Sequence, residues 1–181
     1  MNDLRLVISR EQIAERVAEI GKQISADSPG PVIFIGVLKG AAVFLADLVR
    51  RVSIDATFDF IGVASYGNFS ERGKLWDSSG EVRLTKDVDQ SLRGTDVVLV
   101  EDILDTGLTL TFLKRLLLGH EPRSLRVAVL LDKPSRRKLP VEADYVGFTI
   151  GDEFVVGYGM DYAEQYRNLP DIRVVPNVAL T

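Results

Sequence analysis

Apolar and polar residues alternate along the chain in blocks that predict helices and strands in turn. The first block has apolar residues at helical spacing from Ile13 to Ile24, which is typical of an amphipathic helix. Ser9 and Gln12 precede it with the spacing of a capping box, a common helix start signal. The Pro-Gly-Pro turn at 29–31 then ends the predicted helix.

Later blocks are short apolar runs separated by turn residues, which is the pattern of strands buried on both faces. Between some of these runs, apolar residues again recur at the spacing of a helix. Strands that alternate with helices favour an α/β fold with a mostly parallel sheet flanked by helices, in which ligands bind at the carboxyl ends of the strands. The predicted strands are 32–37, 57–64, 81–84, 97–100, 127–131 and 145–150, the predicted helices are 41–52 and 110–118, and Gly119 is expected just beyond the last helix.

A long polar segment from Tyr66 to Gly80 interrupts this alternation. It contains three glycines and the only tryptophan of the chain, Trp76. Loops of this length in a compact domain are either functional or disordered. We therefore expect a loop or hairpin tip here, separate from the packed core.

Length and composition narrow the class of protein. With 181 residues, of which 46% are apolar, the chain is expected to form a single domain over 1–181. The net charge of −4 disfavours non-specific nucleic-acid binding, so a phosphorylated ligand needs local positive charge, backbone donors or a metal. The chain has no cysteine, no apolar run close to the roughly 20 residues of a membrane span, and no signal-peptide pattern at its start. We expect a cytoplasmic protein without nucleic-acid or membrane partners.

The most informative segment runs from 97 to 109. Four apolar residues are followed by Glu101 and Asp102, and then by Asp105 and a short loop of Thr and Gly before the helical pattern begins. Backbone N–H groups at a helix N-terminus bind phosphate, and two adjacent carboxylates can hold sugar hydroxyls or a divalent cation. Helix capping by Asp105 or Thr106 is the simpler explanation, but it accounts for neither of the first two acids.

Segment 101–107, Glu-Asp-Ile-Leu-Asp-Thr-Gly, resembles the phosphoribosyl pyrophosphate signature of type I phosphoribosyltransferases. Leu38-Lys39-Gly40 resembles the pyrophosphate loop of that family, and Ser65-Tyr66-Gly67 resembles the start of its flexible catalytic loop. Segments 127–134 and 152–162 resemble the purine-binding elements of the hypoxanthine-guanine subfamily. The resemblance covers nearly the whole chain.

The resemblance implies a Rossmann-like core, a flexible catalytic loop at about 65–80 and a small hood formed by the N- and C-terminal segments, with its purine-binding part at about 150–181. The reaction it implies is the transfer of a 5-phosphoribosyl group from phosphoribosyl pyrophosphate to N9 of hypoxanthine or guanine, with release of pyrophosphate, in purine salvage. The implied cofactor is Mg²⁺, and the implied assembly is a homodimer or homotetramer.

The resemblance also assigns roles to individual residues. Asp105 matches the candidate base at purine N7, where a carboxylate can accept a proton or stabilise N7–H as N9 attacks. The metal ligands it implies are Glu101, Asp102 and Asp161. The implied substrate-binding residues are Lys39, Gly40, Ser65, Tyr66, Glu101, Asp102, Ile103, Asp105, Thr106, Gly107, Leu108, Thr109, Lys133, Phe154, Val155, Asp161 and Arg167.

Several of these residues also have an ordinary structural interpretation. Lys39 and Lys133 are otherwise surface lysines, and Arg167 is otherwise half of a surface ion pair. Phe154 and Ile103, taken alone, are expected in the core. The basic residues at 136–138 are expected to form a solvated turn, without a functional role.

Two departures from the family pattern are visible. The loop after Tyr66 is longer than in bacterial-type members, which affects loop closure rather than the core chemistry, and Leu108 stands where some relatives carry lysine. Two other functions remain open: a non-catalytic nucleotide-sensing regulator on the same fold, and a phosphoribosyltransferase that prefers xanthine. Retention of Lys39, Ser65 and Asp105 favours an enzyme.

Overall fold

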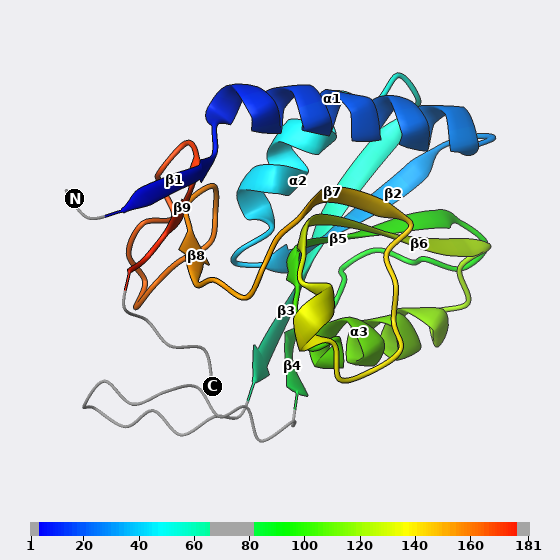
Figure 1. Cartoon of the computed structure of the whole chain (residues 1–181). Coiled ribbons are helices and arrows are strands. Elements are labelled where there is room, and N and C mark those ends of the chain that lie inside the picture. The colour runs from blue at the N-terminus through cyan, green and yellow to red at the C-terminus, as the bar shows by residue number, and fades with distance from the viewer. Residues whose placement is uncertain (1–3, 66–81, 177–181) are drawn as a thin grey trace.

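The computed structural model describes residues 4–65 and 82–176, which form two sheets (Figure 1). The larger sheet has six strands in the order β4-β3-β2-β5-β6-β7, and all of its neighbouring pairs are parallel except β3 with β4. The strands of this sheet are β2 (Val32–Leu38), β3 (Ala56–Ser65), β4 (Val82–Lys86), β5 (Asp96–Leu104), β6 (Ser124–Asp132) and β7 (Tyr145–Thr149).

Helices lie on both faces of this sheet, as the alternating pattern predicted (Figure 1). Helices α1 (Arg10–Asp27) and α2 (Ala42–Leu48) cover one face, and α3 (Leu108–Leu118) covers the other. The chain moves from β2 to β3 in one direction and from β5 to β6 in the other, so right-handed crossovers place α2 and α3 on opposite faces. The sheet therefore has a topological switch point between β2 and β5, where ligands bind in folds of this type.

Helix α1 begins as its sequence predicts. The Ser9 side chain accepts from the backbone N of Gln12, and the Gln12 side chain accepts from the backbone N of Ser9, which completes the capping box. The apolar stripe from Ile13 to Ile24 is buried against the sheet. None of the helices in the described part of the chain is both long and apolar enough to cross a membrane.

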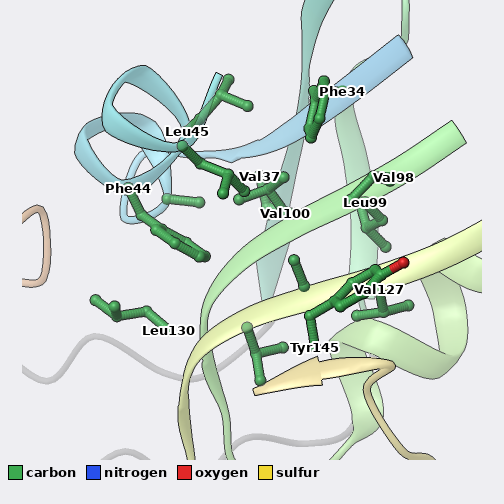
Figure 2. Close-up of a cluster of buried hydrophobic side chains, with 14 of the residues drawn as sticks. Phe34, Val37, Phe44, Leu45, Val98, Leu99, Val100, Val127, Leu130 and Tyr145 are labelled. Atoms are coloured by element: carbon green, nitrogen blue, oxygen red, sulfur yellow. The ribbon is translucent and has the colours of Figure 1, made fainter. Parts of the chain in front are cut away.

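Buried apolar side chains cover both faces of the sheet, because those of α1 and α2 pack on one face and those of α3 on the other. Figure 2 shows Phe44 and Leu45 of α2 beside apolar side chains of the central strands, among them Val37 of β2 and Val100 of β5. Phe44, Leu45 and Val100 are at most 1% exposed. Each fully buried side chain of this size contributes roughly 1.5–3 kcal/mol to stability, because apolar surface is removed from water. The centre of the sheet is therefore stable and fixes the position of the loops at the carboxyl ends of its strands.

The smaller sheet joins the two ends of the chain. Its order is β1-β9-β8, and both of its pairs are antiparallel. This arrangement confirms the predicted hood of N- and C-terminal segments. Its strands are β1 (Arg5–Ile8), β8 (Val155–Val156) and β9 (Ile172–Val174).

Some predicted element boundaries were wrong. Helix α2 ends at Leu48 instead of position 52, because the chain turns there, and α3 begins at Leu108 instead of position 110. Strand β5 continues four residues beyond the predicted 97–100 run, since it pairs with β6 as far as Leu104. Gly119 lies just beyond α3, as predicted, with a φ of −64° in the right-handed region.

Candidate active site

Three loops meet at one edge of the larger sheet, because β2, β5 and β6 are parallel neighbours. These are the turn at 39–41, the loop at 105–107 and the turn that begins at Lys133. The sequence predicted ligand binding in these loops. The structure brings them together at the carboxyl ends of the strands.

Glu101 and Asp102 lie inside β5 and not after it, in the part of the strand that pairs with β6 but extends beyond the pairing with β2, which ends at Val100. The Glu101 carboxylate is buried, and its Oε2 atom has no hydrogen-bond partner within the described residues. Burial and the neighbouring Asp102 charge raise the pKa of Glu101 well above its usual value. Burial also raises the pKa of Asp102, an effect that the hydrogen bonds with Glu101 and with the backbone N–H of Ile103, and then the Arg167 charge, partly offset. A carboxylate pair of this kind gains stability when a cation or a hydrogen-bond donor approaches it.

The turn after β2 contacts Asp102 directly. A Cβ atom on Gly40 would lie 1.7 Å from Asp102 Oδ2, so no larger residue fits without movement of the carboxylate. The hood reaches the same point, because a Cβ atom on Gly159 would lie 2.1 Å from the carbonyl oxygen of Gly40. The peptide bond between Leu38 and Lys39 is cis. The predicted pyrophosphate loop therefore lies between β5 and the hood.

The loop between β5 and α3 forms the predicted phosphate cradle. Gly107 is the N-cap of α3, with a φ of +86°, and no side chain among the described residues caps this helix. A Cβ atom on Gly107 would lie 2.6 Å from Val141 Cγ1, so both its backbone conformation and its packing require glycine. Thr106 Oγ1 accepts a long hydrogen bond of 3.4 Å from the Leu108 N–H. Asp105 and Thr106 are thus not the N-cap, and the first-turn N–H groups are oriented for an anionic ligand.

Asp105 is bound by an arginine that the sequence analysis had assigned to a solvated turn. Arg136 Nε donates to Asp105 Oδ1 at 2.7 Å, and Arg136 Nη1 donates to Asp152 Oδ1 at 3.2 Å. Arg137 donates to the carbonyl oxygens of Leu104 and Asp105. The arginine side chains at 136 and 137 are each only 17% exposed, so the solvated-turn prediction was wrong for both.

The position of Arg136 and Arg137 in the sequence could have indicated their orientation. They lie four and five residues after β6, whose carboxyl end is at the ligand-binding end of the sheet, and Arg136 is the last residue of the short 3₁₀ turn η1 (Pro134–Arg136). A basic residue in that position can turn back toward the acids of the adjacent β5 loop. Charge composition alone does not distinguish this orientation from an outward one.

Lys133 is buried and not at the surface, with 3% exposure. Its Nζ donates to the carbonyl oxygen of Glu153 at 2.6 Å, and its backbone N donates to the carbonyl oxygen of Leu104 at 2.9 Å. Burial lowers the pKa of the Lys133 ammonium. A buried lysine donor next to the hood is suited to recognise an acceptor on a ligand.

Two further predicted residues follow Glu153 directly. Phe154 is half-buried, and Val155 is buried in β8. The Phe154 ring packs edge-on against Tyr162, with 5.4 Å between centroids and 81° between planes. The sequence analysis did not single out Tyr162. Ile103 is half-buried and pairs with Leu131 across β5 and β6, two residues before Lys133.

Arg167 joins the charged residues of the hood. Its Nη2 lies 2.7 Å from Asp161 Oδ1, and its Nη1 donates to the carbonyl oxygen of Gly159 at 2.8 Å. The side chains of Arg167 and Asp161 are each 26% exposed, so this pair is largely buried. Lys39 is exposed, and its Nζ lies 3.0 Å from Glu164 Oε2.

Not every predicted site residue is placed in this cluster. Within residues 4–65 and 82–176, no three acidic or histidine side chains lie close enough to hold a metal ion by themselves, so Asp161 does not share one ligand set with Glu101 and Asp102. Ser65 ends β3, and Tyr66 and the rest of the predicted 65–80 loop lie outside the described residues. Thr109 lies in the first turn of α3 and is half-buried.

Residues 8–163 match the family model of the phosphoribosyl transferase domain. The chain therefore belongs to the phosphoribosyltransferase family, whose members use a divalent metal ion. Within that family it is 45% identical over 172 residues to the hypoxanthine-guanine phosphoribosyltransferase of Bacillus subtilis, an alignment that covers 94% of this chain and 92% of the relative.

Solved structures of two relatives have the same fold. A hypoxanthine-guanine phosphoribosyltransferase of Bacillus anthracis, with a HEPES molecule in its active site, is 50% identical and superposes with a TM-score of 0.86 over 94% of this chain and 97% of that one. A hypoxanthine phosphoribosyltransferase of Staphylococcus aureus is 43% identical, with a TM-score of 0.88 over 96% of this chain and 92% of that one. The expected fold and family are confirmed.

Proposed function

We propose that this chain is a hypoxanthine-guanine phosphoribosyltransferase of purine salvage. It transfers the 5-phosphoribosyl group of phosphoribosyl pyrophosphate to N9 of hypoxanthine or guanine and releases pyrophosphate. The observation that carries the proposal is the buried Lys133, whose ammonium lies beside the hood at the same sheet edge as the phosphate cradle. Similarity to enzymes of this name over more than nine-tenths of the chain supports it.

The reaction needs an anion site and a cation-stabilising site side by side. Breaking the bond between C1 and pyrophosphate builds positive charge on the ribose ring and negative charge on the leaving group. In this proposal the cradle at 105–109 binds the 5′-phosphate through backbone N–H groups and the hydroxyls of Thr106 and Thr109. Glu101 and Asp102 hold the ribose 2′- and 3′-hydroxyls, which gives the buried Oε2 atom of Glu101 the donor that it lacks.

The purine lies between the hood and the β5 loop in this proposal. Lys133 donates to O6, which favours 6-oxopurines over adenine because an amino group at C6 would present a donor to the buried ammonium in place of an acceptor. Asp105 accepts from N7–H, or takes its proton, as N9 attacks C1. Phe154 and Ile103 contact the faces of the ring, and Val155 offers backbone contacts. The turn at 39–40 and Arg167 bind pyrophosphate.

Magnesium fits the acids of this site. Carboxylate oxygens are its preferred protein ligands, and it usually takes only one or two of them together with water and phosphate oxygens. That preference agrees with the separation of Asp161 from the Glu101–Asp102 pair. These three residues would hold Mg²⁺ ions, which would neutralise charge on the pyrophosphate.

A direct assay tests the proposal. Purified protein is supplied with phosphoribosyl pyrophosphate, MgCl₂ and either hypoxanthine, guanine, xanthine or adenine, and nucleotide formation is followed by chromatography. We expect products from hypoxanthine and guanine and little or none from adenine. A faster reaction with xanthine than with either would change the substrate assignment. The absence of any nucleotide would overturn the proposal and favour a nucleotide-sensing role.

The proposal includes self-association and a cytoplasmic location. A homodimer or homotetramer is the assembly that the family resemblance implies. Light scattering coupled to size exclusion measures the mass and distinguishes these states from a monomer. A cysteine-free chain suits the reducing cytoplasm.

A further inference from the structure

The Arg136 side chain connects the two halves of the site. It extends from the end of η1 and reaches Asp105 in the β5 loop through Nε and Asp152 in the hood segment through Nη1. Burial works against the charge of this guanidinium, but the pairs with Asp105 and Asp152 outweigh that effect and raise its pKa. An arginine three-quarters or more buried between two carboxylates is held in one orientation and is not a mobile surface group.

Arg136 contacts the carboxylate of Asp105 through its Nε atom. Arg136 Nε donates to Oδ1, and Arg136 has further contacts of its own. Fixing Oδ1 fixes the plane of the whole carboxylate and hence the direction of Oδ2. The rate of the reaction depends on this orientation, because Asp105 must meet a single ring nitrogen. A carboxylate oxygen that is displaced or turned away would no longer have the distance and angle that proton transfer needs.

The neighbouring arginine holds a different part of the same residue. Arg137 Nη1 donates to the backbone carbonyl oxygens of Leu104 and Asp105, and its Nη2 pairs with Asp132. Arg137 thus holds the backbone path that leads into the phosphate cradle, whereas the contact of Arg136 with Asp105 is with its side chain. Arg136 and Arg137 are adjacent and both positively charged, but their contacts differ, so substitutions can test their roles separately.

We propose that Arg136 is a positioning residue for Asp105: it holds the carboxylate in place and aims Oδ2 at purine N7. This inference rests on the proposed function, since it assumes that Asp105 serves the purine. Arg136 touches neither substrate nor reacting atoms in this role. Its pair with Asp152 also ties the purine side of the hood to the β5 loop.

The experiment compares Arg136→Gln, Arg136→Lys and Arg137→Gln, with Lys138→Gln as a matched control that removes an exposed positive charge from the same turn. Transfer to hypoxanthine gives kcat and KM, and calorimetry gives the affinity for phosphoribosyl pyrophosphate without turnover. We expect R136Q to lower kcat about 10- to 100-fold, a fraction of what a lost base costs. Its affinity for phosphoribosyl pyrophosphate should stay within about threefold of wild type.

The other variants complete the test. R136K keeps the charge without the planar fork and should recover part of the lost kcat. R137Q should mainly weaken phosphoribosyl pyrophosphate binding, and K138Q should match wild type. If R136Q does not fold, R136K alone should show a lower kcat with unchanged affinity. An R136Q enzyme with wild-type kcat, or one whose affinity falls as much as its kcat, would overturn the inference. Inactive wild-type protein would instead overturn the proposed function.

Discussion

The phosphate cradle and the hood lie on opposite sides of one site and are held in different ways. The cradle is a continuous piece of chain between β5 and α3, and the acids that precede it lie on the part of β5 that pairs with β6. The hood is assembled from the two ends of the chain, β1 with β8 and β9 (Figure 1). Its loop contains the non-glycine residues Ala163, Glu164 and Tyr166 at positive φ.

Buried apolar side chains of the hood, such as Met160 and Ile172, belong to the core cluster, and polar contacts also join the hood to the body. The buried Tyr158 hydroxyl donates to Asp47 of α2 at 2.6 Å, and Gly159 packs on Gly40. Other links, such as Lys39 with Glu164, are exposed ion pairs that contribute little stability. Positive φ at residues with a Cβ costs on the order of 1 kcal/mol or more each. We therefore infer that the cradle is preformed and that the hood is the part of the site with the lower local stability.

Asp105→Asn gives the largest expected effect, because it changes the chemistry of the cradle and not its shape. The amide keeps the size of the side chain but offers N7 no negative charge. We expect kcat to fall roughly 10²- to 10⁴-fold while the KM for phosphoribosyl pyrophosphate changes little. Steady-state kinetics with both substrates varied provide the measurement. A raised KM with unchanged kcat would contradict a base role for Asp105.

Gly40→Ala tests the contact between the turn after β2 and the acid pair of β5. The new Cβ would collide with Asp102 Oδ2, so either the turn or the carboxylate must move. A misplacement of about 1 Å can cost on the order of 100-fold in rate, and we expect a loss of roughly 10- to 100-fold in kcat/KM for phosphoribosyl pyrophosphate.

Gly30→Ala is the matched control for that variant, because nothing lies within 4 Å of its added Cβ. It should leave kcat/KM unchanged. Equal activity of the two alanine variants would show that the turn adapts and that the cradle side of the site is less rigid than inferred here.

Tyr158→Phe weakens the attachment of the hood. Burial, followed by the hydrogen bond to Asp47, raises the pKa of Tyr158, so the hydroxyl stays protonated and donates throughout the neutral range. Loss of this bond should cost about 1–2 kcal/mol, because the Asp47 acceptor loses a buried partner. Hydrogen exchange should rise in β8 and β9 but not in β5. A uniform rise across both regions would remove the distinction between them.

The cradle could be predicted from the sequence more fully than the hood, because its residues are consecutive in the chain. The strand, cradle and helix of 97–118 are consecutive, so their pattern and chemistry were visible together, although β5 runs further than its apolar residues indicate. The inward orientation of Arg136 and Arg137 could not be predicted, because it depends on β6 lying beside β5. The contact of Gly40 with Asp102 likewise joins residues far apart in the chain.

The hood was predicted only through the family resemblance. Its strands are two to four residues long, too short for a periodic pattern, and they pair across almost the full length of the chain. The contact of Tyr162 with Phe154 could not be predicted from the sequence, because it depends on the path of the loop between β8 and β9.

Glu164→Gln has the smallest expected effect and probes the exposed edge of the hood. The Glu164 carboxylate lies between Lys39 and Arg167, two cations that the proposed function assigns to pyrophosphate. The hydrogen bond from Lys39, followed by the charges of Arg167 and Lys39, lowers the pKa of Glu164, so it is ionised at neutral pH and competes with an incoming anion. Replacing it with glutamine should therefore raise the affinity for pyrophosphate about two- to fivefold, with a change in Tm of only about 1 °C because the pairs are exposed.

Isothermal titration with pyrophosphate and Mg²⁺ measures this gain, and Glu153→Gln, which removes a carboxylate from another exposed hood pair, is the control. Because a folded-state pKa below the usual value means that the pairs are present near neutrality and lost in acid, the difference between E164Q and wild type should shrink as the pH falls below the usual glutamate range. An E164Q protein that binds pyrophosphate more weakly than wild type would mean that Glu164 orders Lys39 and Arg167 for the ligand. The hood would then be as preorganised as the cradle.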